Sequence, residues 1–310
     1  MLEIILPVFL LILVGYACRH YGVLRPDDAS RLVDVIVYVT FPATLFLGLV
    51  QAPTPNEAWK LPLWSYACIA ASFGLTYLIA RMMKLDNPTT GALISSSAFG
   101  NTAFLGVPIT FAAFGAEGRV SALFYDLFGV SITLYTVGFL LLAHFGGQKP
   151  TLKNSLAFFR TPVFVAAVLA FAVRAWAPMW TETGPGSLLP SRIMIGSLER
   201  LSVMTAPLAM LALGVNLRFR AVVEFAPLVT VSILSKLLFM PLVAFALVHW
   251  FGPAGIPGQT AVMEAAMPSG LVAGVVCGRF GCNARLGAAV TVGTTLAAII
   301  TLPLWAGLVQ

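Results

Sequence analysis

The sequence predicts an all-α polytopic membrane protein with ten transmembrane helices, arranged as two inverted five-helix repeats. Three observations support this fold class: the composition, ten apolar stretches of spanning length, and a similarity between the two halves of the chain. Hydrophobic residues make up 59% of the 310 residues and charged residues only 10%, and the mean hydropathy is +0.93. A soluble domain carries about 25% charged residues. The composition therefore excludes a soluble enzyme, and it also excludes a disordered chain.

A membrane-spanning helix needs about 20 predominantly apolar residues. Stretches that meet this need occur at 2–18, 32–50, 61–81, 90–115, 119–144, 160–177, 197–215, 226–250, 256–279 and 285–308. The first stretch opens with Glu3 and has neither a basic n-region nor a small-residue cleavage site before Arg19. We therefore expect it to be a retained helix and not a signal peptide.

The basic residues predict the orientation of the chain. If the N-terminus lies outside, most of the 18 Lys and Arg residues fall in connections on the inner side, and Lys236 alone falls within a span. Cytoplasmic loops carry an excess of Lys and Arg. We therefore expect a multi-pass protein of the inner membrane with both termini on the periplasmic side. The same rule explains the positive net charge, so nucleic acid is not expected as a partner.

The two halves of the chain resemble each other. Residues 34–50 align with 199–215, and residues 97–115 align with 263–281. Spans one to five therefore map onto spans six to ten, and because five is odd the second half enters the membrane from the opposite side. Inverted repeats of this kind are typical of secondary transporters. The predicted units are a first repeat, a cytoplasmic linker and a second repeat, at 1–144, 145–159 and 160–310.

Spans four and nine hold residues that break helices. Span four contains Asn101 near its middle and Pro108 seven residues later, and span nine contains Pro268 at its centre. Proline removes a backbone donor and clashes with the preceding turn. Inside a bilayer, the freed backbone groups are tolerated only where protein or a water-filled cavity satisfies them. Two breaks at matching positions predict a binding site at the midplane, where helix N-termini attract an anion.

Ionisable residues within spans are costly and therefore mark candidate functional sites. Lys236, Asp126 and Glu264 lie in spans eight, five and nine. Lys236 either balances the charge of a substrate or pairs permanently with Asp126 or Glu264, and the sequence leaves both interpretations open. Asp126 and Glu264 are candidates for charge balance or for carrying a coupled ion.

The segments around the two breaks resemble the auxin efflux carrier family, which includes the plant PIN-FORMED carriers. The run GNTAFLGVPITFAAFG (100–115) resembles the first crossover of that family, and EAAMPSGLVAGVV (264–276) resembles the second. The run ITLYTVGFLL (132–141) resembles its fifth helix. The resemblance extends end to end in helix number and order. It implies a fold related to bile-acid transporters and sodium/proton antiporters, with broken helices four and nine crossing each other.

The resemblance also implies roles for individual parts of the chain. Helices one, two, six and seven would form a scaffold through which a homodimer forms, and helices three, four, five, eight, nine and ten would form the transport core. Asn101 would meet the substrate carboxylate, Pro108 and Pro268 would mark the helix breaks, and Tyr135 would line the pocket. Bacterial members of the family are regarded as carriers of malonate and other small organic acids. The chain departs from the plant members in having no charge within 61–80.

The sequence therefore predicts a secondary transporter of small organic anions, malonate or other carboxylates, which works in the lipid bilayer by an elevator-type movement. The predicted substrate-binding residues are Asn101, Thr102, Pro108, Tyr135, Met267, Pro268, Ser269, Gly270 and Lys236. Neither a cofactor nor a metal is expected, because the three His and four Cys residues lack ligand spacing. Coupling to H⁺ or Na⁺ is left open.

Three other functions compete with this interpretation. The first is a carrier of auxin-like aromatic monocarboxylates, and the second is a channel or non-transporting sensor of the same fold. The third is an intramembrane enzyme, which we do not expect because the chain has no H-E-x-x-H motif and no paired intramembrane aspartates. Saturable uptake and counterflow distinguish a carrier from a channel or sensor.

Overall fold

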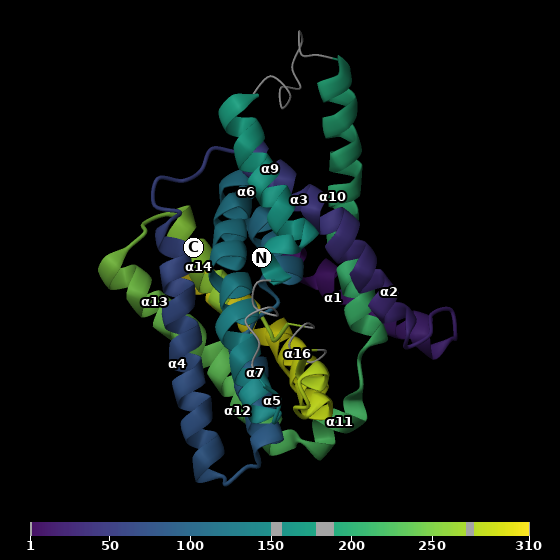
Figure 1. Cartoon of the computed structure of the whole chain (residues 1–310), viewed down its shortest axis with the longest axis vertical. Coiled ribbons are helices and arrows are strands. Elements are labelled where there is room, and N and C mark those ends of the chain that lie inside the picture. The colour runs from purple at the N-terminus through teal and green to yellow at the C-terminus, as the bar shows by residue number, and fades with distance from the viewer. Residues whose placement is uncertain (1, 150–156, 178–188, 271–275, 310) are drawn as a thin grey trace.

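A computed structural model describes residues 2–149, 157–177, 189–270 and 276–309, and this part of the chain is helical apart from its connections and one isolated bridge (Figure 1). Within it, seven helical stretches are long and apolar enough to cross a membrane. The prediction of an all-helical polytopic membrane protein is thus confirmed. The count of ten spans and the inverted repeat stay predictions.

The described helices of the first half follow the predicted spans one to five. In chain order they are α1 (Leu2–His20), α2 (Asp28–Val35), η1 (Ile36–Thr40), α3 (Phe41–Gln51), α4 (Lys60–Met82), α5 (Asn87–Ala98), η2 (Thr102–Gly106), α6 (Val107–Phe124), η3 (Tyr125–Ser131), η4 (Leu134–Gly138) and α7 (Phe139–Phe145). Among these, η1, η2, η3 and η4 are π-helical turns that continue the neighbouring α-helices.

The second half has the same helical character. Its described elements are the 3₁₀ turn η5 (Ala157–Arg160), α9 (Pro162–Trp176), α10 (Leu189–Val215), α11 (Phe219–Glu224), α12 (Ala226–Ile233), the π-helical turn η7 (Leu234–Phe239), α13 (Met240–Phe251), α14 (Ile256–Ala265) and α16 (Ala284–Val309). α9 is apolar but shorter than the spanning helices, and α14 has only 10 residues because the helix ends at Ala265.

A single glycine separates the predicted spans four and five. Helical structure runs from Thr102 to Phe145, a stretch of 44 residues that is too long for one crossing. Gly115 interrupts it with φ 68° and ψ −153°, a conformation that L-residues rarely adopt. The predicted boundary between 115 and 119 therefore corresponds to a sharp turn at this glycine.

Two further glycines set the packing of α1 against α10. A Cβ atom on Gly15 would lie 2.4 Å from the Leu211 oxygen, and one on Gly214 would lie 2.0 Å from the Ile12 oxygen. Small residues allow membrane helices to come into backbone contact in this way. α3 packs beside α9 and α10 (Figure 1). These helices correspond to the predicted scaffold, whose separate movement stays a prediction.

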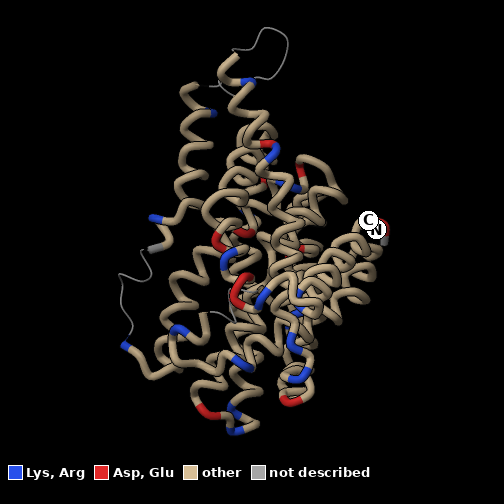
Figure 2. Tube along the Cα trace, turned by 90° about the vertical axis from the view of Figure 1, so that its right-hand side faces the viewer, with Lys and Arg blue, Asp and Glu red and all other residues tan. Residues whose placement is uncertain are grey.

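Charged residues occur toward the ends of the molecule, and a few lie at mid-height among the helices (Figure 2). The charged residues that are buried are Asp126, Lys236 and Glu264 in the part of the chain that the structure describes. They are the same three residues that the sequence places within spans. Because burial of a charge in an apolar medium is costly, a functional site is expected in their surroundings.

Candidate functional site

The two breaks in the helices contact each other through the backbone. The first lies at Phe99–Asn101, between α5 and η2, and the second follows α14. Gly100 and Ser269 form an antiparallel bridge. The Asn101 N–H donates to the Pro268 oxygen (2.7 Å), and the Gly270 N–H donates to the Phe99 oxygen (3.0 Å). Each break thus satisfies the backbone groups that the other leaves free, as the apolar surroundings demand.

The position of the first break corrects one prediction. Pro108 does not mark it, because the helical path runs from η2 into α6 without interruption at this residue. The wider π-helical turn directly before Pro108 accommodates a residue that has no N–H to donate. Pro268 lies where predicted, at the second break, and its carbonyl accepts the Asn101 N–H.

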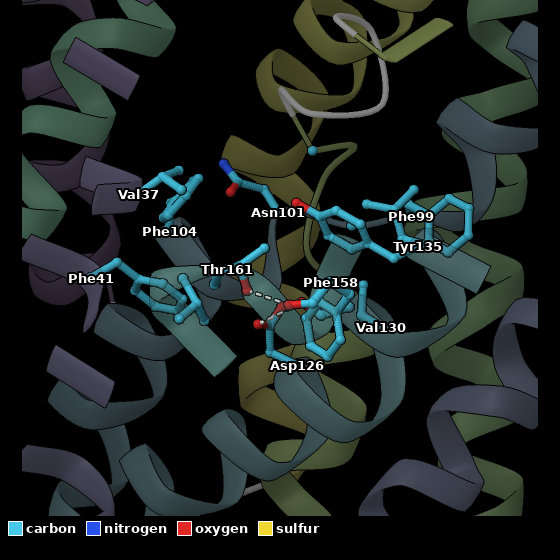
Figure 3. Close-up of a pocket in the computed structure, with 16 residues that line it drawn as sticks. Val37, Phe41, Phe99, Asn101, Phe104, Asp126, Val130, Tyr135, Phe158 and Thr161 are labelled. Carbon is cyan, nitrogen blue, oxygen red and sulfur yellow. Dashed lines mark hydrogen bonds between the residues drawn. The ribbon is translucent and has the colours of Figure 1, made fainter. Parts of the chain in front are cut away.

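A pocket with an empty volume of about 760 Å³ opens beside the paired breaks (Figure 3). Four predicted site residues line it: Asn101, Asp126, Tyr135 and Gly270. The rest of its lining consists of Val37, Phe41, Phe99, Gly100, Ala103, Phe104, Val130, Ser131, Leu134, Phe158, Thr161 and Val163. A mostly apolar pocket with a few polar groups is the usual form of a small-molecule site.

Asn101 presents an amide to this pocket. The residue is only 4% exposed, and its side chain forms no hydrogen bond with the residues that the structure describes. The helix that starts after it also offers donors. Leu105 and Gly106 are the first residues whose N–H groups bond back, both to the Asn101 oxygen. The N–H groups of the first helical turn have no intrahelical acceptor, so they are available to an anion.

Asp126 lies on η3 and lines the pocket below Asn101 in the view of Figure 3. Its Oδ1 accepts a hydrogen bond from Thr102 Oγ1 (2.5 Å), and its Oδ2 accepts one from Ser131 Oγ (3.3 Å). Thr102 itself is buried and does not line the pocket. In this arrangement the Thr102 hydroxyl bonds to Asp126, and its role as a substrate ligand stays a prediction.

Aromatic rings dominate the apolar part of the lining. The Tyr135 ring centroid lies 4.9 Å from that of Phe139 and 5.2 Å from that of Phe158. On the opposite side, Phe41 and Phe104 pack edge to face at 5.4 Å. The pocket can thus hold the apolar body of a ligand against several ring faces and edges.

Phe158 and Thr161 are pocket residues that the sequence did not indicate. Phe158 lies at the end of the stretch predicted as a linker, in η5, and Thr161 caps α9 by accepting the Phe164 N–H (3.2 Å). An aromatic residue just before a Thr-Pro helix start was the only local signal, and it does not indicate a pocket by itself. The end of the linker reaches the pocket because α9 packs along α3.

Lys236 lies behind the breaks and not in the pocket. It is 1% exposed, and its Nζ donates to the oxygen of Ala265, the last residue of α14 (2.6 Å). The C-terminus of a helix carries partial negative charge, so the ammonium stabilises this broken end. Among the described residues, ion pairs join Arg31 to Asp28, Lys60 to Glu57 and Arg285 to Glu224, and Lys236 forms none.

Hydrogen bonds between buried hydroxyls fix the turn that carries Lys236. Ser235 Oγ lies 3.1 Å from Ser72 Oγ of α4, and Ser232 Oγ lies 2.8 Å from Ser97 Oγ of α5. Trp305 Nε1 donates to the Leu237 oxygen (2.8 Å), a carbonyl within the π-helical turn η7. α4 and α16 thus bond to η7 itself, and α5 bonds to the end of α12 directly before it.

The described residues of the second break mainly form hydrogen bonds with neighbouring helices, and few of them line the pocket. Ser269 is 1% exposed, its hydroxyl donates to the Ser96 oxygen (2.5 Å), and its N–H donates to Thr294 Oγ1 (3.1 Å). Met267 is fully buried. Only Gly270 reaches the pocket, and a Cβ atom there would lie 3.0 Å from the Gly100 oxygen.

Glu264 is enclosed at the end of α14. It is 0% exposed, and a Cβ atom on Gly106 would lie 2.1 Å from its Oε2. Neither carboxyl oxygen has a hydrogen-bond partner among the described residues. Lys236 and Asp126 interact with it electrostatically. The same part of the chain contains no group of three or more His, Cys, Asp and Glu residues able to hold a metal ion.

Comparison with known proteins identifies the family of this chain. The family described as "Membrane transport protein" matches residues 1–157 and 148–306. An "Uncharacterized transporter" of Methanothermobacter thermautotrophicus is 30% identical over 305 residues, which cover 98% of this chain and 96% of that protein. A second "Uncharacterized transporter", from Methanocaldococcus jannaschii, is 28% identical over 98% of this chain and 97% of its own length. A "Putative malonate transporter" of Rhizobium meliloti is 25% identical over 96% of this chain and 92% of its own.

Proposed function

Because the chain belongs to the auxin efflux carrier family of membrane transport proteins, we propose that it is a secondary carrier of small organic anions. The observation that supports this most directly is the pair of broken helices beside the pocket. Asn101 and the first turn of η2 offer hydrogen-bond donors where the helix begins, and the surroundings are apolar. A carboxylate that binds there replaces its hydration shell by an amide and free backbone N–H groups.

The proposed mechanism is an elevator-type movement of the core against the scaffold. Val37 and Phe41 reach the pocket from predicted scaffold helix two, and Val163 reaches it from predicted helix six. Asn101 and Asp126 belong to the predicted core. A pocket that is shared between the two groups is carried past the scaffold when the core moves, which is the arrangement that alternating access requires.

Two substrate classes compete for this pocket. The relative from Rhizobium meliloti suggests malonate. The lining suggests a monocarboxylate with an aromatic or other apolar body, because five of the described lining residues carry aromatic rings and Asp126 is the one charged residue among them. A dicarboxylate would bring its second charge toward the Asp126 carboxylate without a cation to offset it. We propose that the monocarboxylate is the better substrate.

We propose that the protein lies in the inner membrane with both termini on the periplasmic side. The connection between α4 and α5, helix α11 and the start of α16 lie at the same end of the molecule (Figure 1). These segments carry Lys84, Arg218, Arg220 and Arg285. An end rich in basic connections is the one expected in the cytoplasm. Lys84→Cys and Gly255→Cys, each as a single cysteine, test this orientation when they are labelled with a membrane-impermeant thiol reagent.

The transport test is counterflow in proteoliposomes with labelled phenylacetate and labelled malonate. Asn101→Ala removes one donor to a charged ligand, a hydrogen bond worth about 1.5–3 kcal/mol. We therefore expect the half-saturation concentration of phenylacetate to rise about tenfold or more. Asn56→Ala is the matched control, because Asn56 is exposed in the connection before α4.

Two results would contradict the proposal. Folded wild-type protein that shows no saturable counterflow of either acid would favour a channel or a sensor. An unchanged half-saturation concentration in Asn101→Ala, with counterflow intact, would remove Asn101 from the binding site. If malonate is exchanged and phenylacetate is not, the carrier function stands and the substrate preference is wrong.

A further inference from the structure

Glu264 is a buried carboxyl group that the structure leaves without a hydrogen-bond donor. It is 0% exposed, and neither Oε1 nor Oε2 has a partner among the described residues. Buried polar groups are normally hydrogen-bonded, and a buried charge is normally paired. An ionised Glu264 would lose its hydration and gain no donor from the described residues in return. This cost disfavours the carboxylate and favours the neutral acid.

The neighbouring groups do not reverse this balance. Lys236 of η7 and Asp126 of η3 are oppositely charged groups that both interact electrostatically with Glu264. The Lys236 ammonium is already bonded to the Ala265 oxygen (2.6 Å) and lies outside ion-pair distance of Glu264. Tyr125 of η3 and Cys68 of α4 are the other titratable groups in this cluster. Among the described residues, α6, α13 and α16, which also pack on α14, add no charge that acts on Glu264.

The space around Glu264 suits a proton better than a metal cation. Its carboxyl group lies so close to Gly106 that even a methyl group there would overlap Oε2. A sodium ion would need several oxygen ligands in addition to this carboxylate, and it would stand near the ammonium of Lys236. A proton needs neither space nor further ligands. The enclosed contact with Gly106 therefore favours H⁺ as the ion that Glu264 binds.

We propose that Glu264 is the proton-binding site that couples H⁺ to anion transport, an inference that rests on the proposed carrier function. With Asp126 ionised and Lys236 protonated, the cluster is neutral when Glu264 holds its proton and carries one negative charge when it does not. An anion enters the pocket beside Asp126 more readily when the cluster is neutral. The anion and the proton are thus bound together and cross the membrane together.

Asp126 connects this cluster to the pocket. It lines the pocket, and it is the carboxylate that interacts with Glu264. Its bond with Thr102 joins η3 to η2, the turn that contains Gly106. Glu264 takes up a proton on one side, and after the core has moved it releases the proton to the other side and returns as the carboxylate.

The first test needs no substrate. Infrared difference spectra of the purified wild-type protein and Glu264→Gln, recorded at neutral pH in lipid, report the C=O stretch of a protonated carboxyl group. We expect a carboxylic acid band in the wild type that Glu264→Gln lacks. Glu117→Gln is the matched control, because Glu117 is exposed on α6 and its substitution should leave the band in place. An identical acid band in wild type and Glu264→Gln would overturn the assignment.

The second test follows protons during transport. Proteoliposomes that contain a pH indicator receive phenylacetate or malonate, and the rate in protein-free vesicles is subtracted. We expect wild type and Glu117→Gln to acidify the lumen as the acid enters. Glu264→Gln should retain counterflow of the same acid and lose the acidification. Uptake that responds to a sodium gradient and not to a pH gradient would overturn the proposal.

The two tests separate failure of the coupling from failure of the carrier function. Counterflow without proton movement in the wild type would overturn the coupling and leave the carrier intact. Absence of counterflow for both acids would overturn the carrier function and the coupling that rests on it. The infrared band would still decide whether Glu264 holds a proton.

Discussion

Two buried carboxyl groups near the crossover have opposite surroundings. Asp126 lines the pocket and accepts hydrogen bonds from Thr102 and Ser131, at 2.5 and 3.3 Å. Glu264 is enclosed against Gly106, and within the described chain neither of its oxygens accepts a hydrogen bond. Their exposed fractions hardly differ, at 3% and 0%. Burial alone therefore does not distinguish them.

The difference lies in which groups the π-helical turn η2 presents to each carboxyl group. η2 contributes the Thr102 hydroxyl to Asp126 and the bare Cα of Gly106 to Glu264. Hydrogen bonds from hydroxyl groups stabilise a carboxylate, whereas a glycine has no side chain that could donate one. One turn thus supports a charged acid on its pocket side and a neutral acid on its enclosed side.

Gly106→Ala should have the largest effect. The new Cβ would lie 2.1 Å from Glu264 Oε2, so η2 and α14 would have to separate. Overpacking of a well-packed site costs about 1–3 kcal/mol, and we expect a clear loss of thermal stability in detergent. Replacement of Glu264 by Ala as well should restore part of it, because the opposing atoms are gone.

The control for this prediction is a glycine with open space around it. Gly74 lies on α4, and a Cβ there would meet no atom within 4 Å. Gly74→Ala should leave stability unchanged or raise it slightly, because alanine favours a helix. Equal stability losses in Gly106→Ala and Gly74→Ala would show that the contact between Gly106 and Glu264 does not set the environment of this acid.

The features that the sequence predicted correctly are those with a local signal. Apolar stretches indicated a polytopic helical protein, and Pro268 indicated the break that follows α14. The break at Phe99–Asn101 lies within predicted span four, which contains Asn101. Gly115, predicted as the end of span four, turns the chain there with a positive φ. These signals are local because they depend on the conformational range of single residues.

The features that the sequence did not predict depend on contacts between distant segments. Pro108 was expected to mark a break, but the π-helical turn before it keeps the helix continuous. Lys236 was expected to face a substrate or an acid, and instead it bonds to a carbonyl that is free only because α14 ends at Ala265. Phe158 reaches the pocket through the packing of α9. No pattern within one segment reports such contacts.

Asp126→Asn should change the preference between substrates. The substitution keeps an acceptor for the Thr102 hydroxyl and removes the negative charge from the pocket. A dianion gains more from this than a monoanion, because the interaction energy scales with the product of the charges. We expect the half-saturation concentration of malonate to fall about tenfold, which corresponds to about 1.4 kcal/mol, and that of phenylacetate to fall less.

Counterflow of both labelled acids, measured in the same preparation, checks this prediction. The ratio of the two half-saturation concentrations is the informative quantity, because a general loss of folded protein does not alter it. If the ratio is unchanged, the Asp126 charge does not face the substrate. The comparison between the two acids would then rest on hydrogen bonding alone.

The smallest effects on the infrared acid band are expected at the two hydroxyl groups that hold Asp126. Thr102→Val removes the 2.5 Å bond and should cost about 1.5–3 kcal/mol, the range for hydrogen bonds to charged groups. Ser131→Ala removes the 3.3 Å bond, which is longer than the usual O–H···O distance, and should cost about 0.5–1 kcal/mol. Thermal unfolding of both variants in detergent measures the difference.

Since neither hydroxyl faces Glu264, both variants should leave the infrared acid band of Glu264 in place. A band that disappears in Thr102→Val would show that the two acids share one hydrogen-bonded system, and the division between a charged and a neutral acid would fail.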